Sequence, residues 1–123
     1  VLVVERVRTA EGKPVVLSRD IFPSRLLAGH EQAVQEMLKR SIYEVLEGDL
    51  GIVIHHGVAR FRPVRADRAV AGRLGVPRGE LLLYLWQVDY ALDGTPVISS
   101  HEFHLADAFD FSVVRRGPGR RLT

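Results

Sequence analysis

The sequence has no cysteine and no long apolar run, and it contains one methionine and one tryptophan. The lack of cysteine excludes disulfide bonds and thiolate metal sites and agrees with a cytoplasmic location. Without about 18 consecutive apolar residues, or a basic segment leading into an apolar one, neither a membrane span nor a signal peptide is expected. The patterns GxGxxG, GxxxxGKS and GxSxG are also missing, so we expect no nucleotide cofactor and no serine nucleophile.

The charge is nearly balanced, with 17 basic and 15 acidic side chains and a formal net charge of +2. A domain that binds nucleic acid by itself is expected to carry a strongly basic face, which this composition does not indicate. Residues 1–114 are predicted to form one domain, because this length suits a single hydrophobic core. The Gly and Pro in the basic stretch 115–123 predict a flexible tail. Since the first residue is Val1, the chain is expected to be a piece of a longer one.

Stretches that are rich in β-branched residues, or that alternate apolar and polar side chains, predict a sheet of about six strands. Gly12 supplies the positive φ that a tight turn between the first two strands needs. Asp93-Gly94 strongly predicts a two-residue hairpin turn. Because hairpins join antiparallel strands, we expect a mostly antiparallel sheet. The predicted strands are residues 1–9, 14–22, 52–66, 80–92, 95–105 and 109–116.

The turn at Asp93-Gly94 also predicts which residues of the last hairpin lie opposite one another. Since successive side chains alternate between faces, one face becomes aromatic and apolar, while polar groups gather at one end of the other. The expected pairs are Leu92 with Thr95, Tyr90 with Val97, Val88 with Ser99, Trp86 with His101, and Tyr84 with Phe103.

Helical periodicity and capping residues predict three helices between the strands. Ser41 and Glu44 have the spacing of a capping box, which predicts that a helix begins at Ser41. Asp67 is placed to cap a further helix that Gly75 ends. The fold class is therefore α+β, with flanking helices on a mostly antiparallel sheet. The helices are expected over about 30–39, 42–47 and 68–74.

The histidines do not predict a metal site. His55 and His56 are adjacent on a predicted strand, so their side chains should point to opposite faces, and so should those of His101 and His104. A metal ion needs three or four convergent ligands.

Two features of the sequence can bind an anion. Arg6 and Arg8 lie on one face of the first strand, and the planar guanidinium suits a carboxylate or a phosphate. The helix start at Ser41 offers free N–H groups and a hydroxyl. The alternative is that the arginines face solvent and the serine only caps. Ser18 or Asp20 shares the face of the arginines if the first hairpin has an odd-length loop, and lies on the other face if the loop is even.

Four segments, in their order and spacing, carry a resemblance to a known family. They are ERVRTAEGKPVVLSRDIFP at 5–23, SIYEVLE followed by Gly at 41–48, ADRAVAGRLGVPRGELLLYL at 66–85 and DYALDGTPVISSHEFHLADAFDF at 89–111. By these segments the chain resembles the effector-binding UTRA domain of GntR-type transcription regulators of the HutC subfamily. The resemblance implies a chorismate-lyase-like fold, a homodimer and a winged-helix DNA-binding domain N-terminal to this chain, with no membrane partner.

The resemblance also implies where a ligand binds. In relatives that bind phosphorylated sugars, an arginine pair and the Ser and Tyr that open a helix hold the anionic end. A Glu two residues beyond the Pro of Gly-x-Pro often meets the sugar, and Ile98 stands there in this chain. Polar residues of the same predicted face are expected to replace it, and Ser18 or Asp20 to contribute from the second strand. The predicted ligand-binding residues are Arg6, Arg8, Ser18, Ser41, Tyr43, Ser100, Glu102 and His104.

The function implied by this resemblance is that of a ligand sensor. The domain is expected to bind a small anionic metabolite, such as a sugar phosphate, an amino acid or an organic acid, and to control operator binding by the winged-helix domain. One alternative is an enzyme of the chorismate-lyase kind, although no acid/base pair stands out. Another is a structural dimerisation module without a working pocket.

Overall fold

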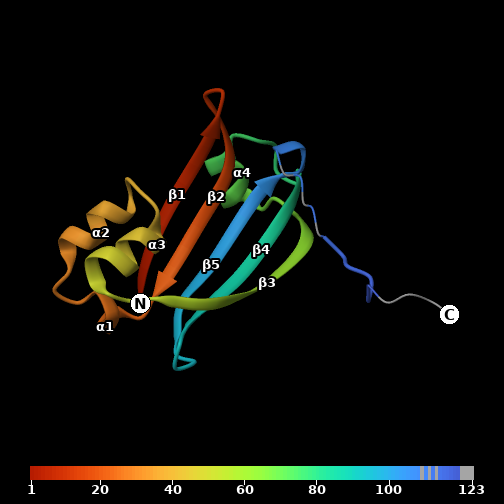
Figure 1. Ribbon diagram of the computed structural model, residues 1–123. Coiled ribbons are helices and arrows are strands. Elements are labelled where there is room, and N and C mark those ends of the chain that lie inside the picture. The colour runs from red at the N-terminus through yellow and green to blue at the C-terminus, as the bar shows by residue number, and fades with distance from the viewer. Residues whose placement is uncertain (109, 111, 113, 120–123) are drawn as a thin grey trace.

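A single antiparallel sheet organises the computed structural model, which describes residues 1–108, 110, 112 and 114–119. Within that part of the chain the sheet has five strands in the order β1-β2-β5-β4-β3 (Figure 1). The strands are β1 (Leu2–Ala10), β2 (Lys13–Phe22), β3 (Ile54–Arg65), β4 (Leu81–Ala91) and β5 (Pro96–Leu105). The predicted α+β class and antiparallel sheet are confirmed.

A sixth strand was predicted over 109–116. Residues 109, 111 and 113 lie outside the described residues, and the described positions of the same stretch are not in a strand. A described 3₁₀ turn, η2 (Ala106–Ala108), follows β5 directly.

Helices cover the two faces of the sheet at opposite ends (Figure 1). One group, α1 to α3, lies beside β1 and β2, and α4 lies behind the other end. The sequence did not predict α1, and the helix expected over 42–47 is a short α-helix that widens into a π-helical turn, η1. The bounds are α1 (Ser24–Leu27), α2 (Glu31–Met37), α3 (Ile42–Glu44), η1 (Val45–Asp49) and α4 (Arg68–Leu74).

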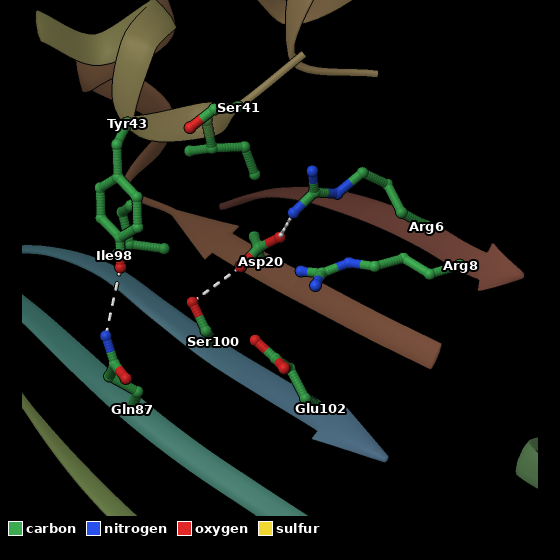
Figure 2. A pocket seen from close by; sticks show the side chains of 10 residues that line it. Arg6, Arg8, Asp20, Ser41, Tyr43, Gln87, Ile98, Ser100 and Glu102 are labelled. Carbon is green, nitrogen blue, oxygen red and sulfur yellow. Dashed lines mark hydrogen bonds and ion pairs between the residues drawn. The ribbon is translucent and has the colours of Figure 1, made fainter. Parts of the chain in front are cut away.

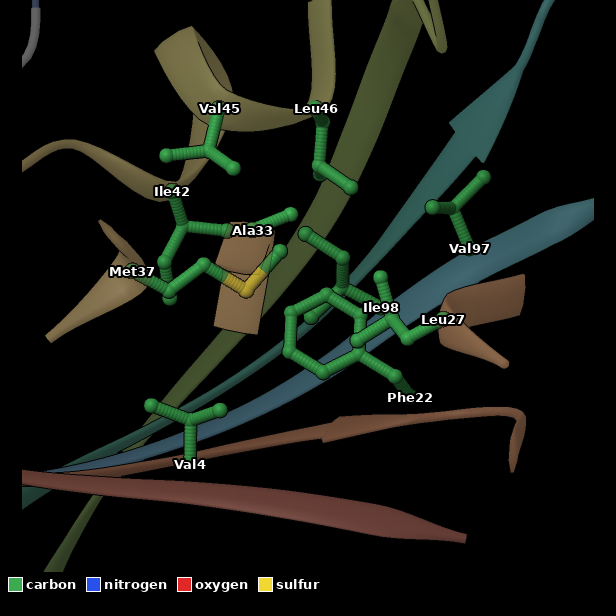
Figure 3. Packing of buried hydrophobic residues seen from close by; sticks show 10 residues of the cluster. All are labelled: Val4, Phe22, Leu27, Ala33, Met37, Ile42, Val45, Leu46, Val97 and Ile98. Carbon is green, nitrogen blue, oxygen red and sulfur yellow. The ribbon is translucent and has the colours of Figure 1, made fainter. Parts of the chain in front are cut away.

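The larger hydrophobic core lies between α1 to α3 and the sheet (Figure 3). Phe22 at the end of β2 and Met37 at the end of α2 are both fully buried in it. Burying such side chains stabilises the fold by about 1.5–3 kcal/mol each, which fixes the helical segment over one end of the sheet. The cluster comprises Val4, Phe22, Leu27, Ala33, Met37, Ile42, Val45, Leu46, Val97 and Ile98.

A second, smaller core lies under α4 on the opposite face. The predicted cap is confirmed, because Asp67 Oδ1 accepts the N–H of Val70 at 2.9 Å. The predicted helix end is also confirmed, since Gly75 takes a left-handed conformation with φ 67°. The buried side chains of α4 pack against Leu17 of β2 and Leu82 of β4.

A β-bulge in the first hairpin decides which residues share a face with the arginines. The loop has two residues and includes Gly12 at φ 78°, and an even loop was expected to separate Ser18 from Arg6. However, the register shifts next to the turn, and Val15 is the extra residue of the bulge. The bulge reverses the parity, so that Ser18 lies directly opposite Arg6, and Asp20 lies on the same face.

The last hairpin keeps the predicted register along most of its length. Val88 faces Ser99, Trp86 faces His101 and Tyr84 faces Phe103, as expected. The turn itself was predicted wrongly. The carbonyl of Ala91 accepts the N–H of Gly94, and the N–H of Ala91 donates to the carbonyl of Thr95. These bonds make a longer turn, in which Gly94 has φ 86° and Leu92 does not pair with Thr95.

A register shift then follows this turn, and Tyr90 faces Pro96 instead of Val97. The extra residue brings the rest of the hairpin back into the expected register.

Outside the area under α4, the second face of the sheet is open. Trp86 is 38% exposed and Val58 51% exposed on this face. The guanidinium of Arg60 lies 5.5 Å from the centre of the Trp86 ring, and that of Arg62 lies 5.4 Å from the Tyr84 ring. In the described part of the chain, no helix is long and apolar enough to cross a membrane.

Candidate functional site

A cavity of about 350 Å³ opens on the face of the sheet that carries α3 (Figure 2). Strands β1, β2, β5 and β4 form its floor, and the start of α3 forms its roof. Six of the predicted ligand-binding residues line it together: Arg6, Arg8, Ser41, Tyr43, Ser100 and Glu102. Four further residues complete the lining: Asp20, Ile42, Gln87 and Ile98.

Strand register brings the floor residues together from distant parts of the sequence. Ser18 lies opposite both Arg6 and Glu102, which places that arginine and that glutamate on the same face two strands apart. In the next row Asp20 lies opposite Ser100, which lies opposite Gln87. Polar side chains from four strands therefore converge on one area.

Arg6 is held by an acidic neighbour within the cavity. Its guanidinium donates to Asp20 Oδ2 at 3.1 Å, and Ser100 Oγ donates to Asp20 Oδ1 at 2.7 Å. Asp20 is only 5% exposed, so this ion pair is shielded from solvent. Among the described residues, the buried Nε of Arg6 has no hydrogen-bond partner. Arg6 therefore has a donor to spare but a charge that is already neutralised.

Arg8 is the second guanidinium, and its surroundings differ. It is exposed, and within the described chain no carboxylate forms an ion pair with it. Figure 2 shows its side chain running beside that of Arg6 into the cavity, with Glu102 pointing toward them from β5. Arg8 is thus the cation that the cavity leaves available.

Glu102 remains ionised at neutral pH. Its Oε1 accepts the Nε2 proton of His104 at 2.8 Å. This hydrogen bond is the main reason that the pKa of Glu102 lies below its usual value, and the charges of Arg8 and Arg6 lower it further against the opposing effect of burial.

Tyr43 connects the helical roof to the floor. Its hydroxyl donates to Asp89 Oδ2 at 2.8 Å, and Gln87 Nε2 donates to Asp89 Oδ1, also at 2.8 Å. Asp89 is 1% exposed, so these bonds satisfy a carboxylate that has no access to water. Burial of the Tyr43 phenol, followed by its bond to Asp89, raises the pKa of Tyr43 well above its usual value. The tyrosine is a fixed hydrogen-bonding group and not a base.

Ser41 stands at the start of α3 but does not cap it. Its side chain makes no capping hydrogen bond to any described residue, so the predicted capping box with Glu44 is wrong. The helix has only the three residues Ile42–Glu44 before it widens into η1, which leaves little regular helix for a capping box or a dipole to stabilise. Ser41 lines the cavity instead, and any contribution to anion binding comes from its hydroxyl.

Ser18 and His104 were predicted to bind the ligand, but they are not among the residues that line the cavity. Ser18 is buried, and its hydroxyl donates to the carbonyl of Arg6 at 3.5 Å. His104 is buried behind Glu102 and holds its carboxylate. Both therefore lie on the cavity's face of the sheet but contact a lining residue and do not line the cavity themselves.

Gln87 is a lining residue that the sequence analysis did not select. It carries an amide on a strand whose other inward side chains are mostly apolar, and this contrast was the available signal.

The histidines are arranged differently from the prediction. A register shift at the start of β3 brings His55 and His56 together, with their Nδ1 atoms 2.9 Å apart, although they were expected on opposite faces. His101 and His104 do lie on opposite faces. No three metal-ligating side chains gather anywhere in residues 1–108 or at the other described positions.

Known structures share this fold. A Bordetella bronchiseptica protein, described as the ligand-binding domain of a GntR-family transcriptional regulator, matches with a TM-score of 0.82 and 20% identity over 93% of this chain and 72% of that one. A GntR-family regulator of Enterococcus faecalis V583 matches with a TM-score of 0.80 and 26% identity, over 92% of this chain and 79% of that one. The effector domain of PhnF from Mycobacterium smegmatis matches with a TM-score of 0.76 and 23% identity, over 92% of this chain and 68% of that one.

The family is shown by the sequence itself. A model of the UTRA domain matches residues 1–110, which include all five described strands and the whole cavity. With that match over most of its 123 residues, the chain belongs to the UTRA domain family.

Proposed function

We propose that this chain is the effector-binding domain of a transcription regulator of the HutC subfamily. In this proposal the cavity binds a small metabolite through an anionic group, and binding controls the operator affinity of a winged-helix domain N-terminal to residues 1–114. The observation that carries the proposal is the unpaired guanidinium of Arg8, which lies in one cavity with the hydroxyl of Ser41. An Arg with free donors in a concave polar site is suited to bind a carboxylate or phosphate.

The relatives support a regulatory role for the cavity. The Bordetella and Enterococcus proteins are described as transcriptional regulators. The Bordetella structure is also described as a ligand-binding domain, and the Mycobacterium structure as an effector domain. This chain covers 49% of the longer PhnF chain, which leaves room in that protein for a second domain. Both observations agree with a sensor that acts on a separate DNA-reading unit.

The regulator works as a homodimer in this proposal. The open face of the sheet, with Trp86 and Val58 exposed, supports self-association because monomers rarely leave large apolar groups together in water. Winged-helix domains in a dimer read half-sites about one helical turn apart, so a small change in their spacing weakens operator binding. The coupling between effector and operator is expected to be about 1–3 kcal/mol. Light scattering that finds only monomers would contradict this part of the proposal.

Ligand binding is tested by titrating sugar phosphates, amino acids and organic acids into the 123-residue chain, by thermal shift and then calorimetry. Arg8→Ala is expected to weaken binding of a hit by about 10-fold to 150-fold, the range for a charged hydrogen bond. Arg78→Ala is the matched control, since Arg78 is also exposed but is not one of the residues that line the cavity. Equal affinities of wild type and Arg8→Ala would remove the arginine from the site.

Control of DNA is tested with the full-length regulator and with the isolated chain. The full-length protein is expected to bind its operator in a way that depends on the ligand, and the isolated chain is expected not to bind it. Tight, specific operator binding by residues 1–123 alone would refute the proposal that a separate domain binds the DNA.

The chorismate-lyase alternative finds less support in the cavity. A general acid and base need pKa values near the working pH. The pKa of Tyr43 is raised and that of Glu102 is lowered, so both move away from neutrality. Release of 4-hydroxybenzoate from chorismate would establish the enzymatic alternative. Absence of any thermal shift across the metabolite panel would favour a purely structural dimerisation module.

A further inference from the structure

The charged side chains of the cavity come from three neighbouring strands. The guanidinium groups of Arg6 and Arg8 project from β1 at its edge, while Asp20 and Glu102 project from β2 and β5. A third carboxylate, that of Asp89, is buried next to the cavity behind Gln87 and Tyr43. The backbones of β1 and β5 lie about two strand spacings, roughly 10 Å, apart, and between them the side chains change from cationic to acidic.

Ion pairing inside the cavity leaves one group of each sign available. Asp20 neutralises Arg6, so Arg8 is the remaining cation. Glu102 uses Oε1 to accept the proton of His104, and its Oε2 makes no hydrogen bond to a described residue. The two available groups are close enough that the charge of Arg8 stabilises the ionised form of Glu102. A ligand therefore meets a free cation and a free carboxylate oxygen side by side.

This arrangement disfavours a doubly charged anion. A phosphate monoester would bring nearly two negative charges to one unpaired guanidinium, beside the carboxylates of Asp20 and Glu102. The cavity is partly shielded from water, where like-charge repulsion is stronger than in bulk solvent. A ligand with one negative group and one protonated amine would instead satisfy both available groups.

We propose that the effector is a small zwitterion of the α-amino acid type, whose carboxylate binds Arg8 and Ser41 and whose ammonium group donates to Glu102. This inference rests on the proposed function, since it names the ligand class of the same cavity. The carboxylate and ammonium groups of an α-amino acid are joined to one carbon, so a single small molecule can meet Arg8 and Glu102 within the one cavity that both line. Ile42 and Ile98 supply an apolar wall for the rest of the molecule. The volume of about 350 Å³ suits a ligand of this size.

Matched pairs of compounds test the ammonium group directly. The 123-residue chain is titrated by calorimetry with the twenty protein amino acids, with their deaminated carboxylic acids, such as glutarate for glutamate and 3-phenylpropionate for phenylalanine, and with hexose phosphates. The best amino acid is expected to bind at least tenfold more tightly than its deaminated partner. Glu102→Gln should reduce this ratio to about twofold while the deaminated acid binds as before or slightly better, because a repulsive charge has been removed. Arg8→Ala should weaken both members of the pair.

The outcomes separate this inference from the proposed function. If a deaminated acid or a hexose phosphate binds as tightly as any amino acid, and binding still requires Arg8, the zwitterion is refuted and the effector cavity stands. If no compound binds in a way that requires Arg8, both are refuted. Because Glu102 also holds His104, circular dichroism and thermal melting of Glu102→Gln check its fold, and Glu102→Asp, which keeps the charge, should retain preference for the amino acid.

Discussion

Gly57 faces Asp89 across the β3 and β4 pairing, and the structure leaves no room there for a side chain. A Cβ at Gly57 would collide with Asp89 Oδ1 and would lie 2.9 Å from Gln87 Nε2. The amide of Gln87 can move, but the short side chain of Asp89 is buried and held by two hydrogen bonds. Gly57→Ala must therefore displace the carboxylate that anchors Tyr43 and the helical roof.

The magnitude follows from the bonds at risk. A hydrogen bond to a charged group contributes about 1.5–3 kcal/mol, and replacing Gly by Ala returns about 0.4–1 kcal/mol by restricting the unfolded chain. The net loss is about 0.5–2.5 kcal/mol. For a domain of this size, about 4 °C of melting temperature corresponds to each kcal/mol. Gly57→Ala should thus melt about 2–10 °C below wild type.

Calorimetric or circular-dichroism melting measures this effect, and Gly72→Ala is the matched control. Gly72 lies within α4, and a Cβ there meets nothing within 4 Å. That substitution should stabilise the protein by about 0.5–1 kcal/mol through helix propensity. The reasoning is refuted if Gly57→Ala melts at or above the wild-type temperature. It is also refuted if Gly57→Ala costs as much in an Asp89→Ala background, where the colliding carboxylate is absent.

Three further predictions concern the same fold and cavity. Tyr43→Phe should lower the free energy of unfolding by about 1 kcal/mol in urea melts, because the partly exposed phenol loses its bond to a buried carboxylate; no change would show that this bond is not needed. Asp67→Ala should lower the free energy of unfolding by about 1 kcal/mol, because it removes a helix cap. Ser41→Ala should change it by less than about 0.5 kcal/mol, because the Ser41 hydroxyl makes no capping bond. Equal losses in the two variants would contradict this. The pKa of Glu102 is lowered in the native state, so its ionised form stabilises the protein above its ordinary value of 4.5, and this contribution disappears as the pH falls through the native pKa. Melting temperatures from pH 7 to pH 3 should show the difference between wild type and Glu102→Gln shrinking in acid. A constant difference would mean that the bond to His104 does not depend on ionisation.

Local sequence signals were reliable where one short segment contained all the information. Asp67 at the cap and Gly75 in the left-handed conformation bound α4 as predicted, because a cap bonds within its own turn. They failed where packing overrides such signals. Ser41 and Glu44 have the capping-box spacing, but the segment after them is anchored by buried side chains and by the bond from Tyr43 to Asp89.

Part of the candidate site could be predicted from the sequence. Arg6 and Arg8 could be paired from alternation along one strand, and the resemblance pointed to Ser41 and Tyr43. Gln87 was not found, because its role depends on contacts with Tyr43 and Asp89.

The sequence by itself determined the five described strands, most of the described helices and the side-chain alternation, since these depend on neighbours a few residues apart. Only the tertiary structure decided the rest. The bulge at Val15 placed Ser18 and Asp20 on the face of the arginines, because one extra residue reverses every later side chain of a strand. The ion pair of Arg6 with Asp20 then left Arg8 as the available cation. Charge balance in a cavity depends on distances between strands, and no single segment of the sequence carries that information.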